Sequence, residues 1–338
     1  MRFARSVSRA PIVSILSPVW ISIAVSALAF ARVECARAEE GAGGHYMPGA
    51  AASFVDALPG RPTLAVANYF MYYNGSASGQ FPFAGLIAFD LHSRAYADSA
   101  LALYETPLKL LGGDYTVGLA IPFVRLEVEG KITTPSGNTI QKSDTATGLG
   151  DMTLYPIMLG WKKGDLKTDV RFGIYAPTGS YEKGRLANLG KNYWTFEPVV
   201  SASWLSSKIG LEVSAYAGLD FSTRNDATDY QSGDVFHLDA TVAQHLPLAR
   251  VGVFGVGANG FYYQQISDDS GPLTQVRGPL AQTLGGFRGR TVGVGPDVSF
   301  ITKIGKTDLV AEVKWLPELS VENRVKGDLV WFKLGLAF

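Results

Sequence analysis

The chain has 338 residues, and its 30 basic and 30 acidic side chains give a formal net charge of zero. Once the first 38 residues are set aside, 25 basic residues face 29 acidic ones, a balance that argues against a nucleic-acid partner. The single cysteine, Cys35, lies in that same N-terminal segment, so the remaining chain has no disulfide, thiolate metal site or cysteine nucleophile.

Residues 1–38 have the pattern of a secretory signal peptide. A start with three arginines is followed by an uncharged stretch, 11–31, and by a small-x-small cleavage sequence, Ala36-Arg37-Ala38. The uncharged stretch is long enough to cross a membrane, so a retained anchor is the alternative. Pro11 and Pro18 disfavour a permanent helix there. We therefore expect cleavage after Ala38.

Residues 39–61 do not have the pattern of a strand, because Gly43-Gly44 and Pro48-Gly49 interrupt them. Two interpretations are open. The segment is either a periplasmic tail or a plug that enters the lumen of a barrel from the periplasmic side. Apolar residues such as Phe54 and Val55 would serve no purpose in a free tail, so the plug is favoured.

From residue 62 onward, apolar and polar side chains alternate with the period of two that is typical of strands. In the last segment, for example, Phe332, Leu334 and Leu336 share one face and Lys333 lies on the other. The pattern predicts about twelve strands. They are 62–73, 83–106, 114–130, 149–161, 166–176, 192–205, 209–221, 234–246, 250–265, 287–303, 307–316 and 327–338.

The connections alternate between short turns, such as 162–165 and 206–208, and long polar loops, such as 131–148 and 177–191. This alternation is typical of outer-membrane barrels, with the short turns in the periplasm. A soluble all-β sandwich or barrel is the alternative, but the strands are longer than usual and aromatic residues lie near their ends. We therefore expect an all-β fold for 62–338, a transmembrane antiparallel up-and-down β-barrel.

This fold implies a place in the bacterial outer membrane, where a sheet must close because lipid offers no partner for edge amides. Outer-membrane lipids are then the surroundings of the barrel. We also expect the barrel-assembly machinery to recognise the chain through its C-terminal Phe338.

Charged residues and one histidine at inward strand positions are expected to line the lumen, because unpaired charges are too costly in a dry core. Their mixed signs favour a hydrated lumen or an ion-pair network over a selectivity ring of one sign. These candidates are Asp90, Arg94, Asp151, Asp169, Arg171, Glu197, Glu212, Asp220, His237, Asp239, Asp297, Glu312, Lys314 and Lys333.

The sequence predicts no catalytic, cofactor or metal site. The four histidines form no closely spaced pair of the kind that binds metals. His92-Ser93 is the one adjacent pair that a lipid-modifying enzyme could use, and it lacks an accompanying motif. We therefore expect a protein that is not an enzyme, with a lipid-modifying barrel as the less favoured alternative.

Several stretches resemble one family. They are Gly44–Gly49 (GHYMPG), Ser53–Gly60 (SFVDALPG), Gly148–Pro156 (GLGDMTLYP), Phe172–Tyr181 (FGIYAPTGSY), Asn192–Pro198 (NYWTFEP) and Gly293–Pro296 (GVGP). They are similar to the transporters named "MetA-pathway of phenol degradation", which are proteobacterial outer-membrane barrels. The resemblance implies a channel or transporter for small hydrophobic or aromatic compounds, and it carries over no catalytic residue. A structural or binding barrel without transport is the alternative.

Overall fold

The computed structural model describes residues 40–41, 43–58, 60–133, 138–272 and 288–338, all within one unit, Ala36–Phe338. The expected signal peptide, 1–38, lies outside the described residues. None of the helical structure described is long and apolar enough to cross a membrane. A helical turn, η1, spans Phe54–Asp56.

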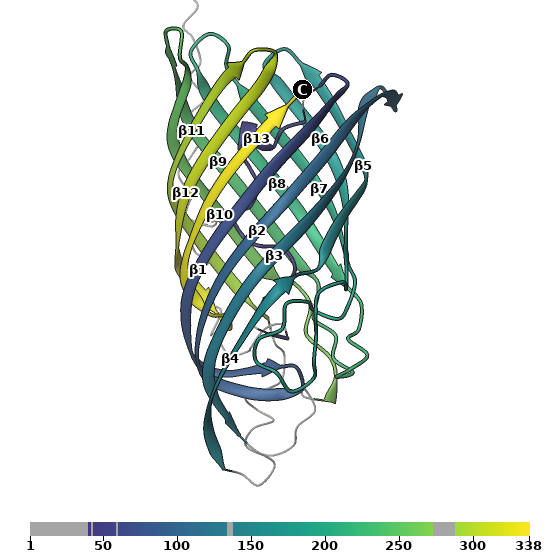
Figure 1. Ribbon diagram of the computed structural model, residues 1–338, viewed down its shortest axis with the longest axis vertical. Coiled ribbons are helices and arrows are strands. Elements are labelled where there is room, and N and C mark those ends of the chain that lie inside the picture. The colour runs from purple at the N-terminus through teal and green to yellow at the C-terminus, as the bar shows by residue number, and fades with distance from the viewer. Residues whose placement is uncertain (1–39, 42, 59, 134–137, 273–287) are drawn as a thin grey trace, which may run out of the picture. The chain divides into compact units, whose positions relative to one another are not determined.

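In the part of the chain that the structure describes, thirteen antiparallel strands form one sheet that closes on itself (Figure 1). Each strand pairs with its neighbours in the sequence, except that β4 pairs with β3 alone and β3 pairs with β2, β4 and β5. The ring closes where β1 pairs with β13, from Ala65 opposite Ala337 to Ser76 opposite Lys326. The strands are β1 Thr63–Phe83, β2 Leu86–Leu110, β3 Gly113–Thr133, β4 Thr139–Leu149, β5 Met152–Lys163, β6 Leu166–Ala176, β7 Thr195–Leu205, β8 Leu211–Ser222, β9 Val235–Leu248, β10 Gly252–Gln265, β11 Arg290–Ile304, β12 Thr307–Glu322 and β13 Lys326–Ala337.

The barrel is twelve strands wide, because β4 and β5 share one position in the ring. β4 pairs with Phe123–Thr133 of β3, and β5 pairs with Asp114–Ala120 of the same strand. Gly150 and Asp151 separate the two. The predicted closed, antiparallel, twelve-stranded barrel is therefore confirmed.

The wall has an apolar outer face and a polar inner face. Val200, Val242 and Phe332 on the outside are 58%, 55% and 43% exposed, whereas the neighbouring Ser201 and Lys333 are buried. Outward apolar side chains alternating with inward polar ones are what a lipid-embedded barrel requires. This face therefore marks the surface that contacts outer-membrane lipid.

The two ends of the barrel differ. One end carries short turns, such as Leu111–Gly112 and Gly164–Asp165, together with the last residue, Phe338. We call it the turn end; it is uppermost in Figure 1. The other end, the loop end, carries the long connections, including 177–194 and 223–234. From β5 to β12, short and long connections alternate as the sequence predicts, whereas short turns join β1 to β2 and β12 to β13 at the loop end.

The first strands are longer than expected. The connection predicted at 74–82 is part of β1, which turns into β2 at Ala84–Gly85, and the predicted loop 131–148 contains β4. These strand ends continue past the apolar face at the loop end. Residues 74–78 are small or polar. They can form a strand there because neither face of the strand has to be apolar where lipid is not in contact.

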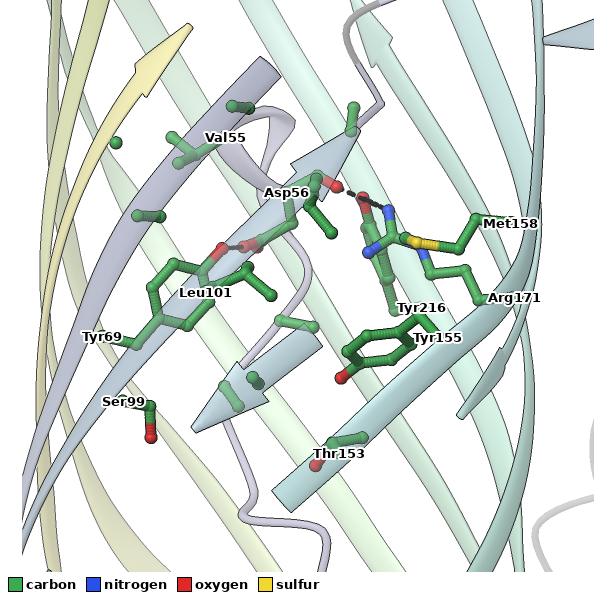
Figure 2. Close-up of a pocket in the computed structure, with 18 of the residues that line it drawn as sticks. Val55, Asp56, Tyr69, Ser99, Leu101, Thr153, Tyr155, Met158, Arg171 and Tyr216 are labelled. Atoms are coloured by element: carbon green, nitrogen blue, oxygen red, sulfur yellow. Dashed lines mark hydrogen bonds between the residues drawn. The ribbon is translucent and has the colours of Figure 1, made fainter. Parts of the chain in front are cut away.

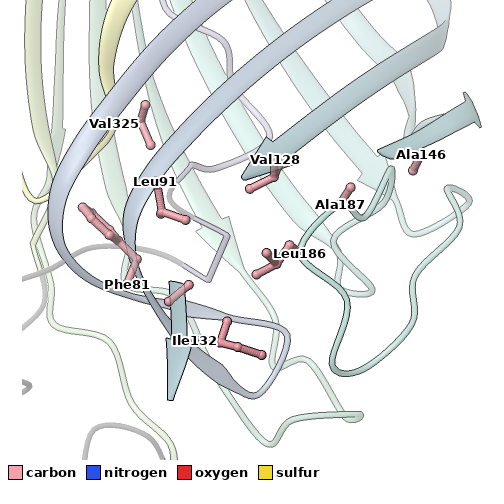
Figure 3. Close-up of a cluster of buried hydrophobic side chains, with 9 residues drawn as sticks. Phe81, Leu91, Val128, Ile132, Ala146, Leu186, Ala187 and Val325 are labelled. Carbon is pink, nitrogen blue, oxygen red and sulfur yellow. The ribbon is translucent and has the colours of Figure 1, made fainter. Parts of the chain in front are cut away.

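A small apolar core gathers at the loop end. Phe81, Leu91 and Val128, from the extended strands, pack with Leu186 and Ala187, from the connection between β6 and β7 (Figure 3). The ion pair between Arg185 and Asp144, at 2.7 Å, ties the same connection to β4. The loop end is thus folded over its own hydrophobic cluster.

Candidate functional site: the filled lumen

The segment before β1 runs along the inside of the barrel. Glu40 lies at the loop end, where its carboxylate accepts hydrogen bonds from Asn225 Nδ2 at 2.8 Å and Thr228 Oγ1 at 3.2 Å. At the turn end, the amide of Gly60 donates to Glu105 Oε2 at 2.8 Å. We call the described residues 40–41, 43–58 and 60–61 the inner segment. Its path differs from a plug inserted from the turn end alone, because its beginning reaches the loop end.

His45 attaches the inner segment to the wall near the loop end. Its Nε2 lies 2.9 Å from Asp151 Oδ2 and its Nδ1 lies 2.7 Å from Thr195 Oγ1. Asp151 also accepts hydrogen bonds from the amides of Gly179 at 2.8 Å and Lys191 at 2.7 Å. Three of the stretches that resemble the family, GHYMPG, GLGDMTLYP and FGIYAPTGSY, therefore meet at one buried carboxylate, and NYWTFEP joins them through the contact of Thr195 with His45.

Tyr46 and Asp239 make the next attachment. The Tyr46 hydroxyl donates a hydrogen bond to Asp239, and its ring stacks on the His237 imidazole with centroids 3.6 Å apart. Asp239 also accepts from the amides of Gly49 and Ala51, at 3.3 and 3.2 Å. Gly49 has a φ of 77°, and a Cβ there would lie 2.2 Å from a side-chain carbon of β12. The carboxylate thus fixes a tight bend that only glycine fits.

A buried charge network holds the part of the inner segment nearer the turn end. Asp56 accepts from Lys333 Nζ at 2.8 and 2.9 Å and from the Tyr69 hydroxyl at 2.8 Å. Glu312 Oε2 lies 2.9 Å from Lys333 Nζ and 3.3 Å from Lys314 Nζ. Opposite charges that are buried together avoid the large cost of an isolated buried ion.

Main-chain groups of the inner segment complete the attachment. The amide of Phe54 donates to Glu212 Oε1 at 2.6 Å, and Glu212 Oε2 lies 2.7 Å from His245 Nε2. Lys314 Nζ donates to the carbonyl oxygen of Ala51 at 2.9 Å. The wall therefore recognises the backbone of this segment as well as its side chains.

The ionisation of the inner segment fits these contacts. Burial alone would raise the pKa of Asp56, but the ammonium groups of Lys333 and Lys314 lower that pKa to about 2. Burial and the neighbouring Asp239 raise the pKa of Tyr46 well above its ordinary value. At neutral pH, Asp56 is therefore an anion that accepts hydrogen bonds, and Tyr46 is a neutral donor.

A cavity of about 450 Å³ lies between the inner segment and the wall. Its walls are mostly aliphatic and aromatic, with a few polar groups, as in small-molecule sites (Figure 2). The lining continues to Arg61 and Asp308 near the turn end. The inner segment and the barrel wall both contribute side chains to the lining. They include Val55, Asp56, Tyr69, Leu101, Tyr155, Met158, Arg171 and Tyr216.

Twelve of the fourteen lumen candidates lie on the inner face of the wall. Seven contact the inner segment directly: Asp151, Arg171, Glu212, His237, Asp239, Lys314 and Lys333. The other five lie beside them, namely Asp169, Glu197, Asp220, Asp297 and Glu312. The structure thus brings most of the predicted charges together around one segment.

Asp90 and Arg94 differ from the expectation. Asp90 is exposed and Arg94 is half-buried, and both pair with β3, Asp90 with Lys131 at 2.8 Å and Arg94 with Glu127 at 3.2 Å. A register shift between Phe89 and His92 changes which side chains of β2 face inward. An alternation taken from the sequence cannot anticipate such a bulge.

The pair His92-Ser93 does not form a nucleophile and its base. The two residues are successive in β2, opposite Glu129 and Val128 of β3. Successive side chains of a strand point to opposite faces of the sheet. The hydroxyl and the imidazole are therefore directed apart.

Sequence reasoning missed the partners on the inner segment. His45, Tyr46 and Asp56 were not among the candidates, although each makes a buried polar contact with the wall. A signal was present, since polar residues in a short apolar segment that enters a lumen need partners there.

The family model described as "MetA-pathway of phenol degradation" matches residues 74–334. An outer-membrane channel from Pseudomonas putida F1 is similar in structure, with a TM-score of 0.57 and 15% identity over 83% of this chain and 97% of that one. The β domain of the Bordetella autotransporter BrkA has a TM-score of 0.43 and 13% identity, over 82% of this chain and 99% of its own. No curated protein matches the chain.

The family match covers most of the described barrel, and the similar channel shares its fold. A closed twelve-stranded ring with an apolar outer face is built for the outer membrane of bacteria, which is where this protein resides. The chain belongs to the MetA-pathway of phenol degradation family of outer-membrane β-barrels.

Proposed function

We propose that this protein is an outer-membrane channel for small hydrophobic or aromatic compounds, and that the inner segment keeps its lumen closed at rest. The cavity beside Tyr69 and Leu101 is the observation that carries the proposal. Its volume of about 450 Å³ falls within the range of small-molecule sites, and its largely apolar walls favour an apolar guest. The family name, with its link to phenol degradation, agrees with such a guest.

A closed lumen means that passage requires movement. Barrels of eight strands are filled by side chains, and those of sixteen or more leave an aqueous channel. Here twelve strands enclose a segment of chain whose charges are matched on both sides. We infer that the segment shifts during transport, and that the turn end faces the periplasm.

Uptake by living cells tests the proposal. Cells that lack the protein should take up phenol or toluene more slowly at limiting concentration, and the wild-type gene should restore the rate. Leu101→Trp fills the cavity and should not restore it. Leu119→Trp places the same ring on the outer face of β3 and should restore it fully. Equal uptake with Leu101→Trp and wild type would contradict the proposal.

A structural or binding barrel without transport is the second candidate. The observation that favours it is the number of buried contacts that hold the inner segment, since a permanent filling would need them all. It predicts no conductance in planar bilayers and the same uptake by cells with or without the protein. A rise in uptake on replacing Asp56 and His45 together with alanine would support the channel instead.

A further inference from the structure

Three side chains able to bind metals meet on the inner wall below Tyr46. They come from three neighbouring strands: Glu197 of β7, Asp220 of β8 and His237 of β9. His237 Nε2 lies 3.1 Å from Glu197 Oε1 and 3.7 Å from Asp220 Oδ1. All three residues are only 2–3% exposed. Two acidic groups and one imidazole are therefore concentrated in a space shielded from water.

The orientation of the imidazole sets this cluster apart from an ordinary ion pair. Nε2 of His237 lies within 4 Å of oxygens from two carboxylates on two different strands, whereas an ordinary ion pair brings it close to one. Tetrahedral bonds of about 2.1 Å place neighbouring donor atoms about 3.4 Å apart, and the two observed spacings bracket that value.

Two glycines make room for the cluster. A Cβ at Gly218 would lie 2.3 Å from His237 Nε2, and one at Gly173 would lie 2.9 Å from Glu197 Oε2. The Tyr175 hydroxyl donates to Glu197 Oε2 at 3.1 Å, as outer partners of metal-binding carboxylates do. Space, donor groups and an orienting hydrogen bond are thus all in place.

We propose that Glu197, Asp220 and His237 bind one divalent transition-metal ion of the Zn²⁺ type. A mixture of carboxylate oxygen and imidazole nitrogen suits such ions better than Mg²⁺ or Ca²⁺, which prefer oxygen alone. Glu197 and His237 also line the cavity, which provides a route for the ion. The inference is independent of what the channel carries.

A bound ion would act through the ring of Tyr46. The charge of the ion balances the two carboxylates, and the metal bonds hold the imidazole in the plane on which Tyr46 stacks. Three strands of the wall and the inner segment would then be joined at one point. The three ligands leave further coordination positions for water or for an oxygen of a guest in the cavity.

Titration calorimetry tests the site on the untagged, full-length protein after treatment with EDTA. We expect wild-type protein to bind one equivalent of Zn²⁺, and His237→Asn, Glu197→Gln and Asp220→Asn to bind none. Tyr175→Phe should weaken binding by about tenfold, as loss of an outer partner does. His92→Gln, which removes a histidine far along β2, should bind like wild type.

Folding and geometry are checked separately. Each variant must run as a compact, heat-modifiable band on a gel, which shows that its barrel has folded. At least one ligand variant should pass this test, because Glu197→Gln and Asp220→Asn preserve the shape of the side chain. Co²⁺ should give wild-type protein the intense visible absorption of tetrahedral coordination, and the ligand variants should lack it. The proposal is overturned if wild-type protein binds no Zn²⁺, or if folded ligand variants bind it as tightly.

Discussion

His45 Nε2 lies 2.9 Å from Asp151 Oδ2, although 106 residues separate them in the chain. The contact joins the inner segment to the short break between β4 and β5, which is also where the amides of Gly179 and Lys191 converge. One carboxylate therefore couples the filling of the lumen to the arrangement of the loops.

Removing the Asp151 carboxylate should weaken the attachment of both the inner segment and the neighbouring loops. Asp151→Ala leaves His45 and two amides without their buried acceptor, and loss of one partner of such a group costs about 3–5 kcal/mol. We expect a fall of that order in the free energy of unfolding, measured by urea titration in detergent. Asp226→Ala, at an exposed loop position, should change it by less than about 0.5 kcal/mol. Equal stability of the two variants would show that Asp151 is not a point of attachment.

The ion pair between Asp56 and Lys333 gives the protein a defined dependence on pH. The pKa of Asp56 is lowered to about 2 in the folded protein, from an ordinary value of 3.8. Such a group stabilises the fold fully above its unfolded pKa, and the stabilisation is lost as pH falls through the folded pKa. The two values differ by somewhat less than two units, which corresponds to about 2–3 kcal/mol.

We therefore expect the stability difference between wild type and Asp56→Asn to be constant from pH 7 to about pH 4. It should shrink as the pH is lowered further toward 2. Unfolding by urea at a series of pH values measures it, and Asp226→Asn serves as a control without a buried partner. A difference that disappears between pH 7 and 5 would assign the effect to another group.

A methyl group at position 218 should disturb the wall below Tyr46. In Gly218→Ala the new Cβ would lie 2.3 Å from His237 Nε2, so the imidazole must move. Overpacking of this kind costs about 1–3 kcal/mol. Gly43→Ala is the matched control, because its nearest neighbour, a side-chain nitrogen, would be 3.5 Å away. Thermal unfolding followed by circular dichroism compares them, and equal melting temperatures would argue against the tight fit.

The apolar outer face predicts that the free-energy cost of an introduced charge depends on its depth in the bilayer. Val200 lies in the middle of β7 on the outer face and is 58% exposed, so Val200→Arg places a cation in lipid. At the centre of a bilayer this costs about 2–4 kcal/mol. Asp165→Arg, in the turn between β5 and β6, should cost far less. Folding into lipid vesicles measures both, and equal costs would mean that β7 does not cross the membrane there.

Period-two alternation was enough to predict the closed ring. Lipid on one side and polar groups on the other require every spanning strand to alternate apolar and polar residues. β9 and β13 begin and end close to the predicted positions. The alternation of apolar and polar residues weakens where both faces of a strand contact water. That is why the second half of β1 and the whole of β4, in which Ile140 is the one large apolar residue between Thr139 and Gly148, were expected to be loop.

The lumen was predictable in composition but not in its pairings. Inward charges of both signs are visible in the sequence, yet the partner of Lys333 is Asp56, which lies 277 residues away. Such pairings depend on strand register and on the path of a segment that has no periodicity of its own. Glu197, Asp220 and His237 were predicted to line the lumen, but their grouping was not, since they come from three strands and have no motif spacing.

The path of the inner segment restricts how the lumen can empty. Glu40 is held at one end of the ring and β1 begins at the other, so twelve strands encircle a chain that passes through them. A threaded chain cannot swing aside as a hinged lid does. It can leave only lengthwise, releasing Glu40, His45, Tyr46 and Asp56 from their partners as it slides, and re-entry must thread the same ring again.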